Sequence, residues 1–128
     1  MTTIRVLSGK QIREAVQMVD IVDAVERAFI ALSSGRAEMP VRAHISIADP
    51  EGVALFMPSY MKSAGMIGIK TVTLFEDNRR SGIPYIQGMV SLFDGNSGSP
   101  QAVLDGTTIT ALRTGAASGL ATRLLARQ

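Results

Sequence analysis

Apolar and polar positions follow three patterns along the chain, and each pattern predicts a different kind of element. Between Ser8 and Gly35, apolar side chains recur about every 3.6 residues, which is typical of one face of a helix. Between Met39 and Asp94 they alternate with polar residues, as along a strand. After Asp94, a turn leads into a long helix of small residues. Because strands joined by short turns pair antiparallel, this order predicts an α+β fold with a mainly antiparallel sheet and flanking helices.

The first part of the chain is expected to hold a short strand at residues 4–7 and then two helices. Ser8 and Gln11 have the spacing of a capping box, which predicts the start of the first helix. Asp20 is expected to cap the second helix, and Gly35 is expected to end it. The apolar face of the second helix is expected to be Ile21, Val25, Ala28 and Leu32.

The middle of the chain contains the main strand candidates. The first alternates over residues 42–47, and residues 49–52 then have the composition of a hairpin turn. Its apolar positions are Ala43, Ile45 and Ile47, and its polar positions are Arg42, His44 and Ser46. Further strands are expected at residues 53–57, 66–75 and 85–93. Residues 76–84 are expected to form a loop, and residues 94–98 a second turn.

The last helix carries an arginine on its predicted apolar side. At about 100° per residue, the apolar side chains of this helix fall within roughly 60° on either side of Ile109, and Arg113 falls inside the same arc. The other apolar members of this arc are Leu112, Ala116, Leu120 and Leu124. A guanidinium is almost never buried without an anionic partner, because its desolvation is costly. The partner of Arg113 is therefore expected to be a ligand carboxylate or phosphate, or alternatively a structural partner, Asp94 or Asp105.

Two further cations stand where a structural pattern would favour another residue type. Arg42 opens the first alternating strand, directly after the segment that Pro40 stiffens. Lys70 lies in the middle of a strand whose other residues are nearly all apolar, small or threonine. The structural alternatives are a solvated strand end for Arg42 and a solvent-facing side chain for Lys70. The one histidine, His44, has neither a cysteine partner for a usual zinc site nor a recognisable triad. We interpret it as a strand-surface or packing residue and expect no metal site.

Composition narrows the class of protein. A chain of 128 residues that is 46% hydrophobic can form one domain with a core, so residues 1–128 are expected to be a single domain. The net charge of +2 is spread along the chain without a basic stripe, which excludes an obvious nucleic-acid surface. The absence of cysteine fits a reducing compartment. No apolar run reaches the length of a signal peptide or membrane span, so a cytoplasmic protein without membrane contact is expected.

Four motifs, in order along nearly the whole chain, resemble the ornithine cyclodeaminase, archaeal alanine dehydrogenase and mu-crystallin family. They are Met39-Pro40 with Arg42, residues 68–70, residues 82–84 and residues 99–127. Within the last motif, RTGAASG is more similar to the alanine dehydrogenase branch than to the cyclodeaminase branch. The resemblance implies a substrate-binding and dimerisation domain, the N-terminal part of a two-domain enzyme. The Rossmann domain that binds NAD(H) or NADP(H) is then expected to begin about where this chain stops, at Gln128.

The resemblance also implies roles for four residues. Those matching Arg42, Lys70 and Arg113 bind the carboxylate of a small amino or imino acid, and the one matching Arg113 also lies near the nicotinamide. Lys70 is in addition the candidate for acid–base or electrostatic assistance in catalysis, because burial and cationic neighbours can lower a lysine pKa. Tyr85 occupies a position where relatives often place a small hydroxyl residue near the cofactor. The family's catalytic aspartate is expected to belong to the domain that would follow Gln128.

The chain is therefore expected to be part of an NAD(P)-dependent enzyme, a homodimer, that acts on a small α-amino or imino acid. Alanine dehydrogenase, ornithine cyclodeaminase and ketimine reductase chemistry remain open, as does the choice between NAD and NADP. The chain alone is expected to be inactive, because its sequence has no glycine-rich phosphate loop. The alternatives are a non-catalytic dimeric module that binds a small carboxylate and a purely structural dimerisation unit.

Overall fold

A seven-stranded sheet is the centre of the computed structural model, which describes residues 3–127. The strands are β1 (Arg5–Leu7), β2 (Ala37–Glu38), β3 (Ala43–Ile47), β4 (Gly52–Met61), β5 (Met66–Phe75), β6 (Ile86–Asp94) and β7 (Pro100–Asp105). Their order is β1-β7-β6-β5-β4-β2, with β3 also paired to β4. All pairs are antiparallel except β1 with β7, which is parallel. The predicted α+β fold with a mainly antiparallel sheet is confirmed.

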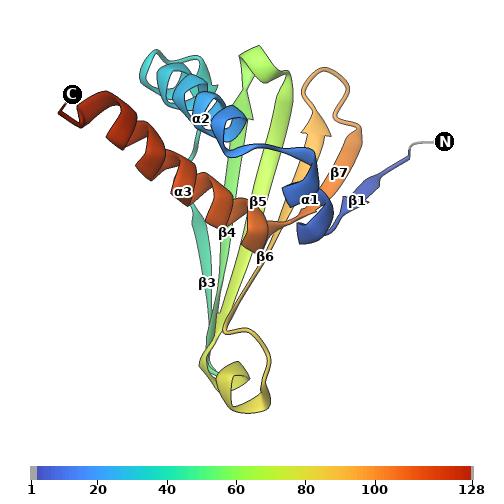
Figure 1. Ribbon diagram of the computed structural model, residues 1–128. Helices are drawn as coiled ribbons and strands as arrows, with labels where there is room; N and C mark the ends of the chain where they lie inside the picture. The colour runs from blue at the N-terminus through green and yellow to red at the C-terminus, as the bar shows by residue number, and fades with distance from the viewer. Residues whose placement is uncertain (1–2, 128) are drawn as a thin grey trace.

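The three α-helices lie together in front of one face of this sheet (Figure 1). They are α1 (Gly9–Ala15), α2 (Met18–Ser33) and α3 (Gly106–Leu125), and two short 3-10 helices are η1 (Lys62–Ala64) and η2 (Glu76–Ser81). Among residues 3–127, no helix covers the opposite face (Figure 1). In the same part of the chain, no helix is long and apolar enough to cross a membrane.

The starts of the first two helices illustrate one correct and one wrong prediction. Ser8 caps α1 in a complete capping box, in which its side chain accepts from the Gln11 N–H and Gln11 reaches back to the Ser8 backbone. The prediction that Asp20 caps the second helix is wrong. Helix α2 begins at Met18 after Gln17, and Asp20 lies inside the first turn. A carboxylate is also favoured there by the helix dipole, so the residue type alone did not separate the two positions.

The buried face of α2 is rotated from the predicted one. Val25 is buried as expected, but Ala28 and Leu32 are exposed, and their place is taken by Val22 and Ala31. The predicted face was wrong because only one narrow stripe of α2 meets α3, and apolar residues beside that stripe stay in solvent. The predicted stop is correct, since Gly35 follows the helix with a φ of 69°.

The main strands of the middle region lie close to their predicted positions. The bounds of β5 are the predicted residues 66–75. The turn that joins β3 to β4 is residues 48–51, one residue before the predicted 49–52, because Gly52 already belongs to β4. Strand β4 is longer than the predicted 53–57 and runs through Pro58. Pro58 pairs with Ile69 of β5, while on its other side it falls between the segments that pair with β2 and with β3. A proline is tolerated there because its missing N–H leaves no partner strand unsatisfied.

Two strands and one helical turn were not predicted. Strand β7 was overlooked because it lies directly between a turn and a helix, and β2 has only two residues. The expected loop at residues 76–84 contains the 3-10 helix η2, which Gly82 ends with a φ of 69°. None of these differences changes the architecture, although β7 provides the only parallel neighbour for β1 within residues 3–127.

The core lies between α2 and α3. Ala116 is fully buried and Leu120 nearly so, in one cluster with Val22 and Val25. Two glycines, at positions 115 and 119, keep the surface of α3 low where α2 crosses it, so that Gly119 faces Val22. On the outer side of this contact, Arg123 forms ion pairs of 2.7 Å with Asp23 and 2.8 Å with Glu26.

Candidate functional site

Lys70 lies near the middle of β5 on the face that the helices cover. It is directly opposite Met57 of β4 and Val90 of β6, and paired residues of neighbouring strands point to the same face. That face is identified by Gly88, two residues before Val90, because a Cβ atom at Gly88 would touch the backbone of Gly106 at the start of α3. Lys70 therefore points toward the layer that contains α3.

Arg42 lies on the same face, on the other side of Met57. Strand β3 pairs Ala43 with Phe56, so extending this register by one residue sets Arg42 opposite Met57. Arg42, Met57 and Lys70 thus form one row across the sheet. Arg42 itself is exposed and just outside the strand, which agrees with the predicted place at a strand end.

Arg113 is on α3, seven residues after Gly106, and the prediction that it is buried is wrong. Its side chain is exposed. The reason is its place on the helix: it is roughly 60° around the axis from Ala116, the residue buried most deeply, and so lies at the edge of the buried stripe. The expected apolar residue Leu124 is exposed too, because the last turn extends past the core.

Neither Asp94 nor Asp105, the two expected structural partners, forms an ion pair with Arg113. The Asp94 carboxylate accepts from the N–H groups of Asn96 and Ser97, which closes the turn after β6. The Asp105 carboxylate accepts from the Thr108 N–H and caps α3. Among residues 3–127, no ion pair involves any of the cations Arg42, Lys70 and Arg113.

The pKa of Lys70 depends on both of the other cations. Burial lowers the pKa of Lys70 below its usual 10.5, and the positive charges of Arg113 and then Arg42 lower it further. Charges act on one another in this way only when they lie close together, so α3 and the β3 end of the sheet bring their arginines to the same lysine. The cluster has three positive charges and no anion of its own in the described chain.

Tyr85 lies apart from this cluster. It directly precedes β6, and its carbonyl accepts from the Phe75 N–H at the far end of β5. The guanidinium of Arg79, on η2, lies 4.4 Å from the centre of the Tyr85 ring. The position is roughly 17 Å along the strand from Val90, the partner of Lys70. The structure therefore brings together Arg42, Lys70 and Arg113, but not Tyr85.

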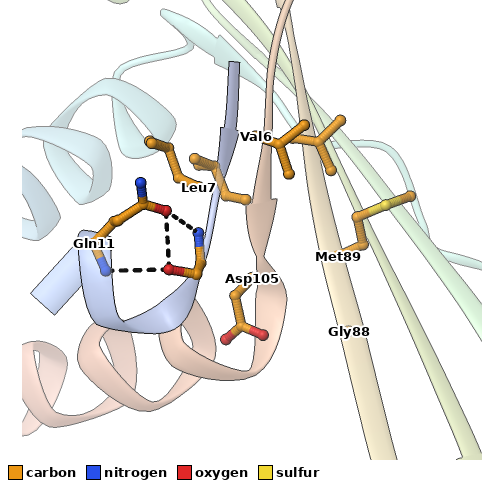
Figure 2. Close-up of a pocket in the computed structure, with 9 residues that line it drawn as sticks. Val6, Leu7, Gln11, Gly88, Met89 and Asp105 are labelled. Atoms are coloured by element: carbon orange, nitrogen blue, oxygen red, sulfur yellow. Dashed lines mark hydrogen bonds between the residues drawn. The ribbon is translucent and has the colours of Figure 1, made fainter. Parts of the chain in front are cut away.

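A shallow hollow of about 440 Å³ lies elsewhere, where β1 and β7 meet α1 (Figure 2). Its lining is mostly apolar and includes none of the three cations. The polar groups around it serve the helix caps: Figure 2 shows the Gln11 side chain held by Ser8. Among the described residues, no group of His, Asp and Glu side chains is arranged to hold a metal ion. The cation cluster is thus the best candidate for a functional site.

Comparison with known proteins gives matches over nearly the whole chain. Residues 3–128 match the model of the ornithine cyclodeaminase/mu-crystallin family. Delta(1)-pyrroline-2-carboxylate reductase of Bacillus cereus is 36% identical over 122 residues, which make up 95% of this chain and 38% of that protein.

Two solved structures share the fold. Delta(1)-pyrroline-2-carboxylate reductase of Thermococcus litoralis, in complex with NADH and L-proline, has a TM-score of 0.89 and 39% identity, over 97% of this chain and 38% of that chain. An archaeal alanine dehydrogenase dimer with bound NAD has a TM-score of 0.88 and 32% identity, over 97% and 38%. This chain therefore spans a little over a third of the length of these relatives. Since the match extends over nearly all of its sequence and its fold, the chain belongs to the ornithine cyclodeaminase/mu-crystallin family.

Proposed function

We propose that this chain binds the α-carboxylate of a small amino or imino acid and is part of an NAD(P)-dependent enzyme that acts on it. The observation that carries the proposal is the convergence of Arg42 and Arg113 on Lys70 without a neighbouring anion among the described residues. Like charges held together repel one another, so a bound anion would stabilise them. A carboxylate fits because a guanidinium presents two parallel N–H donors to its two oxygens.

Lys70 is proposed to assist proton movement at the substrate. Its lowered pKa gives it a larger neutral fraction than a free lysine at the same pH, so more of it is available as a general base, and its protonated form gives up the proton more easily. A nicotinamide cofactor, when bound, would take or supply hydride at the α-carbon. The proposal covers alanine dehydrogenase, ornithine cyclodeaminase and ketimine reductase chemistry.

Arg113 is the residue proposed to face the cofactor as well as the substrate. It is exposed, and none of the described ion pairs uses its guanidinium. Tyr85 fits a cofactor contact less well, because Arg79 lies over its ring. The 128 residues contain no G-x-G-x-x-G loop for a pyrophosphate, so we place the rest of the NAD(P) site outside them.

A homodimer through the open face of the sheet completes the proposal. Side chains on that face include the exposed apolar residues Val6, Ile45 and Met89. An uncovered apolar sheet invites pairing with another surface, and a second copy supplies a complementary one. The assembly of the archaeal alanine dehydrogenase as a dimer supports this choice.

The test replaces Arg42, Lys70 and Arg113 singly by methionine in the complete natural protein. Each change is expected to lower kcat/KM by about 30-fold, or about 2 kcal/mol, because each removes one cation from a bound carboxylate. The exposed cations Lys62 and Arg127 provide matched controls, and Lys62→Met and Arg127→Met are expected to have normal kinetics. Normal kinetics in all three site variants would contradict the proposal. Binding of an amino acid by the wild-type protein without turnover would instead favour a non-catalytic carboxylate-binding module.

A further inference from the structure

The row of cations continues along β3 as a polar stripe. Arg42, His44 and Ser46 alternate with the residues that point to the open face, so all three lie on the helix-covered side of the sheet. The Nε2 atom of His44 lies 3.0 Å from the Ser46 Oγ. This hydrogen bond holds the ring in place and, among residues 3–127, leaves its Nδ1 without a partner.

His44 is one row away from the carboxylate-binding cations. Residues two apart on one face of a strand are separated by roughly 6.8 Å, which is comparable to the length of a small amino acid. In Figure 1, α3 crosses the upper part of the sheet, and the lower part of β3, β4 and β5, toward η2, has no helix in front of it. His44 and Ser46 are both exposed. A ligand held by the cations therefore has free access to them.

The surroundings of His44 make a purely structural role weak. Its row across the sheet continues with Leu55 and Val72, and the Ser46 row continues with Val53 and Leu74. The pair is thus a single polar spot on an otherwise apolar surface beside the cluster. Within residues 3–127, none of the ion pairs involves His44.

We propose that His44, held by Ser46, determines side-chain specificity by binding an oxygen on the substrate's side chain, a hydroxyl or a carboxylate. This inference rests on the proposed function, in which Arg42, Lys70 and Arg113 hold the α-carboxylate. The imidazole offers a donor or an acceptor to a hydroxyl, and a donor to a carboxylate. A substrate whose side chain lacks oxygen gains nothing from His44.

The experiment measures the dissociation constants of L-alanine, L-serine and L-aspartate for the complete natural protein by calorimetry. His44→Leu is expected to weaken the binding of serine, aspartate or both by about tenfold, the loss of one hydrogen bond to a polar ligand, and to leave alanine unchanged. A loss for serine alone identifies a hydroxyl, and a loss for aspartate alone a carboxylate. Ser46→Ala is expected to act in the same direction by a smaller factor, and His44→Gln to restore part of the binding.

Arg113→Met separates this inference from the proposed function, because it is expected to weaken the binding of all three amino acids by the same factor. If Arg113→Met has this effect, while His44→Leu weakens the binding of all three amino acids equally or of none, the role of His44 is overturned and the carboxylate site stands. If Arg113→Met changes none of them, the proposed function fails. Failure of all three amino acids to bind the wild-type protein would overturn both. Circular dichroism of each variant checks folding, which a change at an exposed strand position is expected to preserve.

Discussion

Gly106, the first residue of α3, lies against Gly88 of β6 so closely that a Cβ atom at position 106 would overlap the β6 backbone. This contact fixes the start of α3 two residues from Val90, the cross-strand partner of Lys70. The distance between Arg113 and Lys70 therefore depends on two glycines, neither of which takes part in the chemistry of the site.

Gly106→Ala is expected to destabilise the protein by about 1–3 kcal/mol and to weaken carboxylate binding, because the added methyl group pushes α3 from the sheet. Gly115→Ala is the matched control on the same helix. A Cβ atom at Gly115 would meet only the Met18 Cε, at an ordinary 3.8 Å, so this change is expected to stabilise the protein by roughly 0.5–1 kcal/mol. Urea unfolding and calorimetric titration measure both effects, and equal behaviour of the two variants would contradict the prediction.

Lys70→Met is expected to raise the melting temperature at neutral pH. The pKa of Lys70 is lowered in the folded protein, so its charged form is disfavoured there relative to the unfolded chain, whose value is near 10.5. The penalty is fully present below the folded pKa and disappears as the pH rises toward 10.5. The advantage of Lys70→Met over wild type should therefore shrink with rising pH, as thermal unfolding from pH 7 to 10.5 would show.

The control for this pH dependence is Lys62→Met, which removes an exposed lysine from η1. Its melting temperature at pH 7 is expected to stay close to that of wild type, because a change at an exposed position costs little. A pH-independent difference for Lys70→Met as well would mean that the pKa of Lys70 is not lowered in the folded protein.

Asp105→Ala is expected to cost about 1 kcal/mol at pH 7, because it removes the N-cap of α3. Hydrogen bonds from the Thr108 side chain and backbone hold the pKa of Asp105 below its usual 3.8. This stabilisation is fully present above pH 3.8 and is lost as the pH falls through the lower, folded pKa. Asp105→Asn keeps an acceptor oxygen and should remain close to wild type at pH 7. Urea unfolding at pH 7 and pH 3 would disprove the capping role if the alanine and asparagine variants were equally stable.

Met89→Arg tests the dimer. Met89 lies on the open face of β6 with 45% of its surface exposed, so an arginine there fits the isolated chain but places a charge in the proposed interface. The complete natural protein is expected to change from dimer to monomer at micromolar concentration in sedimentation equilibrium. Val19→Arg, at an exposed position of α2, is expected to leave the dimer intact. A wild-type protein that is monomeric at tens of micromolar would exclude the proposed interface.

The sequence predicted the elements that are specified locally. The bounds of β5 follow from its continuous apolar pattern between two turns, and the capping box at Ser8 needs only its own side chains. The buried face of α2 and the exposure of Arg113 depend on where α3 crosses, which no single helix pattern contains. The grouping of Arg42, Lys70 and Arg113 was predicted from the family resemblance. The three residues are far apart in the chain, so no local pattern could show that they meet. The alternation along residues 42–47 in the sequence already indicated that His44 and Arg42 point to the same side of the strand. Only the register of β3 with β4 shows that this side is the one covered by the helices.

Pro58 has a consequence for the adaptability of the site. Two of the three cations are on regular elements, Lys70 within β5 and Arg113 within α3, whereas Arg42 is on the segment between β2 and β3 that faces Pro58 and pairs with no strand. A shift of that segment breaks no sheet hydrogen bond. The proposed site thus combines two cations held by regular elements with one, Arg42, that can move without disturbing the sheet, so a ligand of different width can be accommodated by moving the segment around Arg42 alone.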